Sequence, residues 1–131
     1  MTARLELIPL LGFPLVEPGD DLVQLFIDAL QDNALSLQEG DVLVVAQKIV
    51  SKAENRYVRL ADVNVSAEAY ALAAQAGKDP RQVQLILQES KSVLRVRPGV
   101  IIVEHRNGYV HANAGIDKSN IRFIIHFGLP S

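Results

Sequence analysis

The sequence predicts one α+β (mixed α/β) domain that spans residues 1–131. In this domain, helices pack on a mixed sheet. Three observations support this fold class. Short apolar runs typical of strands occur in the same chain as segments of helical periodicity. An Asn-Gly dipeptide separates two strand-like runs, which is typical of a β-hairpin. Of the 131 residues, 49% are hydrophobic, and a chain of this length buries roughly two-thirds of its unfolded surface.

Composition excludes several classes of protein. The chain has no cysteine, so disulfides and thiolate zinc sites are excluded. A formal charge of −2 means that the domain has no overall positive charge that would attract nucleic acid or an anionic membrane. The apolar N-terminus is interrupted by Glu6 and Pro9, and no apolar run reaches the roughly 20 residues that span a bilayer. We therefore expect a cytoplasmic protein.

The first elements are a strand, a loop and a helix. Residues 5–10 alternate as a strand, and an apolar loop over residues 11–18 contains glycine and two prolines. A helix follows, with Asp20 as its expected N-cap. Its apolar face comprises Leu22, Leu25, Phe26, Ala29 and Leu30.

Two further strands are expected before the next helix. After a turn at residues 38–40, the run from Asp41 to Ala46 is short, apolar and β-branched, which predicts a strand covered on both faces. Residues 56–60 predict another strand.

The second half predicts two helices and then strands. An alanine-rich helix over residues 66–76 should stop at Gly77, and Asp79 followed by Pro80 should start a helix that ends near Ser90. Strands are expected over residues 93–97 and 100–106, with a tight hairpin turn at Asn107-Gly108 before residues 109–112. A polar loop over residues 113–120 and a last strand over residues 121–127 complete the chain.

Several groups of residues are candidates for chemistry. The basic residues Lys48, Lys52, Arg56 and Arg59 follow a predicted strand, where a lysine can hold a phosphate, although ordinary surface lysines fit the same pattern. The loop over residues 113–120 offers Asp117 as a hard oxygen ligand for Mg²⁺ or Mn²⁺, although an ordinary connection also fits. His105 and His111 flank the hairpin turn and are expected as an exposed pair; no histidine metal spacing occurs.

Three segments together resemble the coenzyme F420 γ-glutamyl ligase family. The first is Gly12-Phe13-Pro14-Leu15-Val16 followed by Gly19-Asp20-Asp21-Leu22. The second runs from Glu39-Gly40-Asp41 through the apolar stretch into Ser51-Lys52-Ala53-Glu54. The third is Asn113-Ala114-Gly115-Ile116-Asp117-Lys118-Ser119-Asn120. Their order and spacing are similar to those of the N-terminal part of that family.

The resemblance implies a GTP-dependent ligase that adds L-glutamate to the phosphorylated F420 precursor through an acyl phosphate. It implies that Lys52 is catalytic and contacts the GTP phosphates, and that Asp117 holds Mn²⁺ or Mg²⁺; it also allows for K⁺. It implies a homodimer that binds only small-molecule substrates. The nucleotide-binding residues that it implies are Phe13, Pro14, Leu15, Val16, Gln47, Lys48, Lys52 and Asn120.

The resemblance stops after Asn120. The following run from Ile121 to Gly128 does not match the family pattern, and the family's second half carries further metal ligands and nucleotide contacts. Two interpretations therefore stay open. The chain is a ligase domain, or it is a non-catalytic fragment or a nucleotide-binding or cofactor-binding module of the same ancestry.

Overall fold

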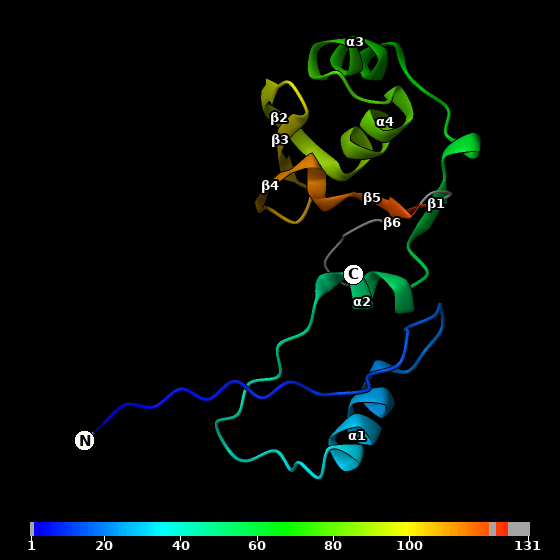
Figure 1. Ribbon diagram of the computed structural model, residues 1–131. Coiled ribbons are helices and arrows are strands. Elements are labelled where there is room, and N and C mark those ends of the chain that lie inside the picture. The colour runs from blue at the N-terminus through cyan, green and yellow to red at the C-terminus, as the bar shows by residue number, and fades with distance from the viewer. Residues whose placement is uncertain (1, 121–122, 126–131) are drawn as a thin grey trace.

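A computed structural model describes residues 2–120 and 123–125, and it confirms the α+β class. Within these residues there are four α-helices and two antiparallel sheets of three strands (Figure 1). The helices are α1 (Leu22–Asp32), α2 (Gln47–Ala53), α3 (Ala67–Ala76) and α4 (Pro80–Glu89). The strands are β1 (Tyr57–Arg59), β2 (Ser90–Arg97), β3 (Val100–His105), β4 (Val110–Ala112), β5 (Asp117–Asn120) and β6 (Phe123–Ile125). None of the described helices is long and apolar enough to cross a membrane.

The hydrophobic core lies between the pair of helices α3 and α4 and the sheet with order β2-β3-β4 (Figure 1). Strand β3 alternates strictly, so Ile101, Val103 and His105 point inward. Helix α4 contributes Val83 and Ile86, which are fully buried. Small residues on α3 let the two helices pack closely. The buried members of this core all lie after residue 66, and the partly buried Val58, Leu60, Val63 and Val65 pack against it from the preceding segment.

Local capping confirms the predicted boundaries of α3 and α4. The Ser66 hydroxyl accepts a hydrogen bond from the Ala69 N–H, and α3 ends at Gly77, whose φ is 63°. The Asp79 carboxylate accepts from the Arg81 N–H at 2.9 Å, with Pro80 in the first helical position.

The predicted hairpin is confirmed at Asn107-Gly108. The Gly108 N–H donates to the His105 carbonyl at 2.9 Å, and the His105 N–H donates to the Tyr109 carbonyl at 2.8 Å. Gly108 has φ 88°, whereas Asn107 is not among the residues with positive φ. The connection is thus a three-residue loop with glycine in the left-handed position.

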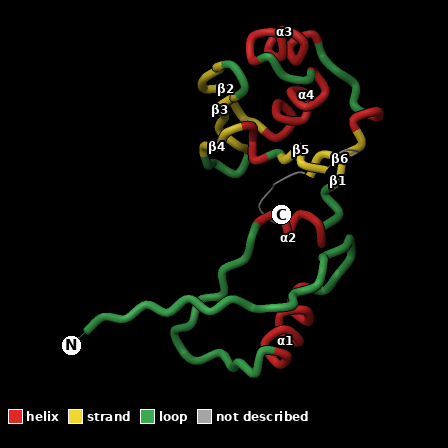
Figure 2. Tube along the Cα trace, in the orientation of Figure 1, coloured by secondary structure: helices red, strands yellow, loops and turns green. Residues whose placement is uncertain are grey.

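Two predicted strands in the first half are wrong. Residues 5–10 and 41–46 form no strand, and Figure 2 shows both as loop. Their side chains are largely exposed, including Leu7 at 81% and Val44 at 84%. A strand is stable only when its backbone pairs with a neighbour, and neither segment has one in the described part of the chain.

Helix α1 confirms the predicted apolar face but corrects its cap. Ala29 is buried and the other four predicted face residues are half-buried. The cap is Asp21, whose carboxylate accepts from the Gln24 N–H, while Asp20 instead accepts from the Glu17 N–H at 2.8 Å. The sequence contains two adjacent aspartates. The first, Asp20, accepts a hydrogen bond within the turn before the helix, so the second, Asp21, caps the helix.

The loop predicted over residues 113–120 is only partly correct. Residues Asn113–Gly115 form a short 3₁₀ turn with left-handed backbone, and strand β5 begins at Asp117. The expected strand over residues 56–60 is confirmed as β1, which pairs antiparallel with β6. Of the last predicted strand, residues 123–125 are confirmed as β6. The remainder of that prediction lies outside the described residues.

Candidate functional site

Lys48 and Lys52 lie on helix α2, not at the end of a strand. They are four residues apart, so they lie on neighbouring turns of one helix face. Lys52 is in the last turn, where a cation suits the negative end of the helix dipole. Gln47 is the first residue of the same helix. The structure therefore brings together three of the residues predicted to bind nucleotide.

The other two members of the predicted basic segment are engaged elsewhere. The guanidinium of Arg56 is 3.6 Å from the Glu89 carboxylate on α4. Arg59 lies 3.9 Å from Asp62, and both side chains are exposed. The basic segment is therefore not a single patch, and only its two lysines share a helix face.

The predicted loop over residues 13–16 is fastened next to the end of α2. The Gly19 N–H donates to the Ala53 carbonyl at 2.9 Å, which ties the loop to the last residue of the helix. Phe13 packs on Phe26 of α1 with ring centroids 5.0 Å apart. Val16 is buried, whereas Leu15 is exposed. The first two matching segments therefore meet in space, although more than 30 residues separate Phe13 from Gln47.

Ser51 lies between the two lysines and is fully buried. Its hydroxyl has no hydrogen-bond partner within the part of the chain that the structure describes. Its carbonyl accepts from the Arg56 N–H at 2.9 Å, so its backbone stabilises the end of α2. A buried hydroxyl without a partner is destabilising, and such groups in native proteins call for a functional or structural reason.

The third matching segment contains a run of left-handed backbone. Asn113, Ala114 and Gly115 have φ of 53°, 52° and 69°. Alanine costs about 1–2 kcal/mol in this region, and left-handed residues usually occur singly. The turn persists because Ala114 is fully buried and because the Asn113 side-chain oxygen accepts from the Ile101 N–H at 3.0 Å. Strain held by the surrounding core in this way is typical of functional sites.

This turn leads into β5, which contains both Asp117 and Asn120. The side chains of these two residues lie outside what the structure describes, so their predicted roles stay predictions. Among the described residues, no group of three histidine or acidic side chains converges to hold a metal. The described part of the chain therefore does not by itself assemble a metal site.

Lys118 on β5 lies near the turn between α3 and α4. Burial lowers the pKa of Lys78, and the positive charge of Lys118 lowers it further. The pKa of Asp79 is lowered to about 2, chiefly by its hydrogen bonds to the Arg81 guanidinium, with a smaller effect from Lys118. The third matching segment therefore lies near the turn between α3 and α4, although about 40 residues of sequence separate Lys118 from that turn.

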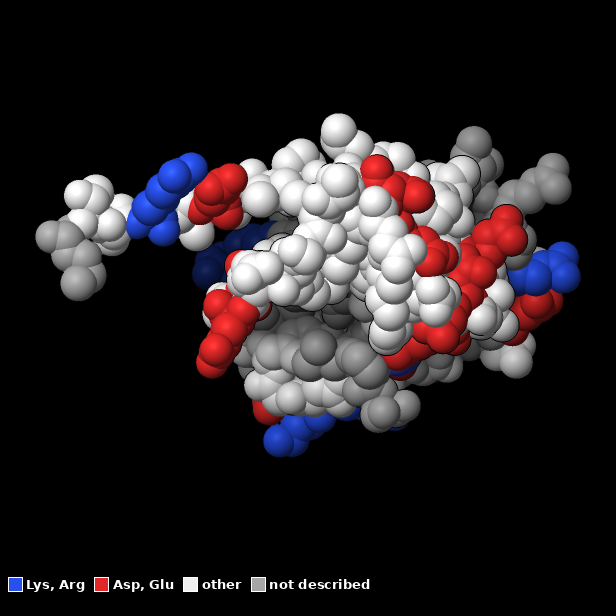
Figure 3. Space-filling model, turned by 90° about the horizontal axis from the view of Figure 1, so that it is seen from below, with Lys and Arg blue, Asp and Glu red and all other residues white. Residues whose placement is uncertain are grey.

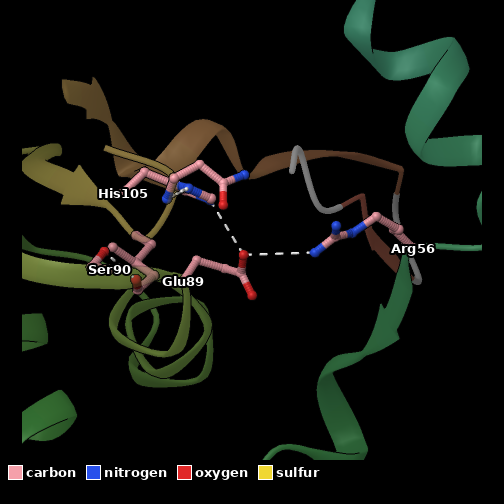
Figure 4. A network of polar contacts seen from close by, with 6 residues as sticks. Arg56, Glu89, Ser90 and His105 are labelled. Carbon is pink, nitrogen blue, oxygen red and sulfur yellow. Dashed lines mark hydrogen bonds and ion pairs between the residues drawn. The ribbon is translucent and has the colours of Figure 1, made fainter. Parts of the chain in front are cut away.

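Sequence reasoning missed a polar network between α4, β3 and the segment after α2 (Figure 4). Nε2 of His105 lies 3.3 Å from Oε2 of Glu89, the oxygen that Arg56 also approaches. Nδ1 of His105 accepts from the Asn107 N–H at 3.1 Å, so a neutral ring would carry its proton on Nε2, which approaches Glu89 but makes no hydrogen bond among the described residues. The inward register of β3 is the signal that could have located His105.

Tyr109 extends this network to α2. Its ring stacks on His105 with centroids 4.4 Å apart and planes inclined by 10°. Burial raises the pKa of its hydroxyl, Glu89 raises it further, and nearby Arg56 and Gln47 oppose the shift. The expected exposed pair of histidines is wrong, because His105 is 2% exposed and stacks on Tyr109, while His111 meets the edge of the same ring.

Comparison with known proteins identifies the family. The model of the F420-0:Gamma-glutamyl ligase family matches residues 11–131, so the match continues past Asn120, where we expected the resemblance to stop. The coenzyme F420:L-glutamate ligase of Methanothermobacter thermautotrophicus is 45% identical over 117 residues, which cover 89% of this chain and 46% of the relative. The relative from Methanopyrus kandleri is 46% identical over 119 residues, which cover 91% of this chain and 44% of the relative. The one from Archaeoglobus fulgidus is 42% identical over 118 residues, with coverages of 90% and 45%.

The family match includes the helix with the two lysines, the loop fastened to it and the left-handed turn. The chain spans less than half the length of the curated relatives that it matches. The matched region nevertheless covers most of this chain, and the chain belongs to the F420-0:Gamma-glutamyl ligase family.

Proposed function

We propose that this chain is the nucleotide-handling half of a ligase that joins L-glutamate to the coenzyme F420 precursor at the expense of GTP. The observation that carries the proposal is the junction of α2 with the loop over residues 13–19, inside a region that matches ligases. Lys48 and Lys52 supply two positive charges on one helix face, and the loop supplies backbone groups beside them.

The proposed chemistry activates a carboxylate before the amide forms. A carboxylate oxygen of the precursor attacks the γ-phosphorus of GTP, the bond to the bridging oxygen breaks, and GDP leaves. The amine of L-glutamate then attacks the acyl carbon, phosphate leaves, and the amine loses a proton to solvent. The protein contributes mainly position and charge, since Lys52 offsets negative charge on the phosphoryl group as it transfers.

Divalent metal belongs to this proposal with Asp117 as one ligand. When bound, Mn²⁺ or Mg²⁺ supplies charge neutralisation at phosphate oxygens. A single carboxylate is a weak site for such ions, and the described residues add no cluster to it. Phosphate oxygens of the nucleotide and residues outside the described part of the chain are available as further ligands.

A second candidate function is a non-catalytic module that binds the nucleotide or the deazaflavin cofactor without turnover. The two candidates share the nucleotide site and differ in whether glutamate is transferred.

Thermal unfolding with GTP and Mn²⁺ tests the shared site. A ligand at a hundred times its Kd contributes about 2.7 kcal/mol if it binds only the folded state, so the melting temperature should rise by several degrees. Lys52→Ala should lose most of that rise, whereas Lys91→Ala, in an exposed lysine of β2, should keep it. An equal rise in all three proteins would contradict the phosphate role of Lys52.

A further inference from the structure

Helix α2 carries the positive charge on which the proposed nucleotide site depends. Residues 2–47 contain eight acidic residues and a single arginine. On the side of the molecule seen from below, the charged side chains are mainly acidic (Figure 3). The first cations that follow this acidic segment along the chain are Lys48 and Lys52. Because phosphate is attracted only to positive charge, the direction of these two side chains decides where it can bind.

A neighbouring face of α2 lies against the hairpin that joins β3 and β4. Gln47 and Ser51 are four residues apart, so they share one helix face, and Ser51 is fully buried. The Gln47 amide directs a hydrogen-bond donor at the hydroxyl of Tyr109, which follows the hairpin turn. Burial raises the pKa of that hydroxyl, and the contact with Gln47 lowers it. The hairpin and the first residue of α2 therefore meet through these two side chains.

The contact between Tyr109 and Gln47 leaves the glutamine available to a second partner. The Tyr109 hydroxyl is buried, and within the described residues the approach of Gln47 falls short of a well-aligned hydrogen bond. A carboxamide offers two N–H donors and an acceptor oxygen. Gln47 can therefore contact Tyr109 and a nucleotide at the same time.

The hairpin holds the Tyr109 ring firmly. One face of the ring stacks on His105, with centroids 4.4 Å apart, and His111 meets its edge at 6.2 Å. His105 is itself 2% exposed, and its N–H donates to the Tyr109 carbonyl at 2.8 Å. A side chain fixed in this way can transmit the position of the core to the helix that it contacts.

We propose that Tyr109 is a positioning residue for the nucleotide and acts through Gln47. Its hydroxyl fixes the rotation of α2 about the helix axis and thereby the direction of the two lysines. Successive residues of a helix are about 100° apart around the axis, so a contact on the Gln47 face sets the face that begins at Lys48. The inference rests on the proposed nucleotide site, and it adds to that site a residue from the second half of the chain.

Titration calorimetry of the chain with GTP and Mn²⁺ tests this role. Tyr109→Phe keeps the stacked ring and removes only the hydroxyl, so the Kd for GTP should rise about fivefold. The melting temperature without nucleotide should stay within about two degrees, because the lost hydroxyl makes no well-aligned hydrogen bond among the described residues. Tyr70→Phe is the matched control, since Tyr70 is exposed on α3, and it should leave the Kd unchanged.

A double-mutant cycle shows whether the hydroxyl acts through Gln47. Gln47→Ala alone should also raise the Kd, because it removes the side chain that Tyr109 positions. Adding Tyr109→Phe to Gln47→Ala should then raise the Kd by less than about twofold, since the contact is already lost. A tyrosine that only stabilises the fold would lower the melting temperature, and its effect on Kd would multiply with that of Gln47→Ala.

Two results would overturn the positioning role. One is a Kd for Tyr109→Phe equal to that for Tyr70→Phe, and the other is full multiplication of the effects at Tyr109 and Gln47. Lys52→Ala separates this role from the proposed function. If Lys52→Ala raises the Kd but Tyr109→Phe does not, the nucleotide site stands and the positioning role is wrong. If the unaltered chain binds no GTP, the site itself is wrong and the positioning role fails with it.

Discussion

Nε2 of His105 and Oε2 of Glu89 lie 3.3 Å apart, joining the end of α4 to the inner face of β3. The Arg56 guanidinium approaches the same oxygen at 3.6 Å. The Glu89 carboxylate at the end of α4 therefore contacts both strand β3 and the segment that follows α2. Glu89 therefore holds the lysine helix relative to the core.

Glu89→Gln should lower the free energy of unfolding by about 1–2 kcal/mol, because it removes the negative charge that the half-buried Arg56 guanidinium faces at 3.6 Å. Glu104→Gln is the matched control, since Glu104 pairs with the exposed Lys91 at 3.4 Å and should contribute less than about 0.5 kcal/mol. Urea unfolding followed by circular dichroism measures both. Equal losses of unfolding free energy in the two variants would show that the contacts of Glu89 stabilise the protein no more than an exposed ion pair does.

Asn113→Ala should cost about 2 kcal/mol, because it removes the acceptor for the Ile101 N–H and places alanine at a φ of 53°. Asn113→Gly removes the acceptor but tolerates the backbone, so it should cost about 1 kcal/mol. The difference between the two variants measures the strain of the left-handed turn. If glycine costs as much as alanine, backbone strain has no part in the effect.

Ser51→Ala should stabilise the isolated chain by about 1 kcal/mol, because it removes a buried hydroxyl that has no partner among the described residues. Ser66→Ala should have the opposite sign and lose about 1 kcal/mol, since that hydroxyl caps α3. A loss of stability in both serine variants would indicate that Ser51 has a hydrogen-bond partner in the folded protein.

Asp79 should make stability depend on acid pH. Its pKa is lowered from 3.8 to about 2, so its ion pair with Arg81 stabilises the folded state fully above about pH 4 and is lost as the pH falls through about 2. Asp79→Asn keeps a helix cap but removes the charge, and it should cost about 1 kcal/mol at pH 7 after allowance for the exposed Arg81. This difference should shrink between pH 4 and pH 2.5; a constant difference would contradict it.

The sequence predicted the second half of the fold well because its signals are local. Ser66, Gly77 and Asp79 fix helix ends through contacts within a few residues, and Gly108 fixes the hairpin in the same way. The strand predicted over residues 41–46 failed because pairing depends on a distant partner, and none lies in the described chain.

The candidate site was predictable only in part. Its motifs identified α2, the loop over residues 13–16 and the left-handed turn, but they could not show that Gly19 bonds to Ala53. Glu89 was missed because a single glutamate at a helix end carries no pattern, and its role depends on His105 and Arg56 meeting it in space. Asp117 and Asn120 stay predictions, because their side chains lie outside what the structure describes.

The most direct test of the proposed function is the transfer of glutamate. We would incubate the chain, alone and with the unmatched part of the Methanothermobacter thermautotrophicus relative, with the unglutamylated F420 precursor, L-glutamate, GTP and Mn²⁺, and detect adducts by mass spectrometry. The proposal predicts a GTP-dependent glutamyl adduct that Lys52→Ala abolishes. A well-folded sample that forms no adduct would contradict the ligase assignment and favour the non-catalytic module.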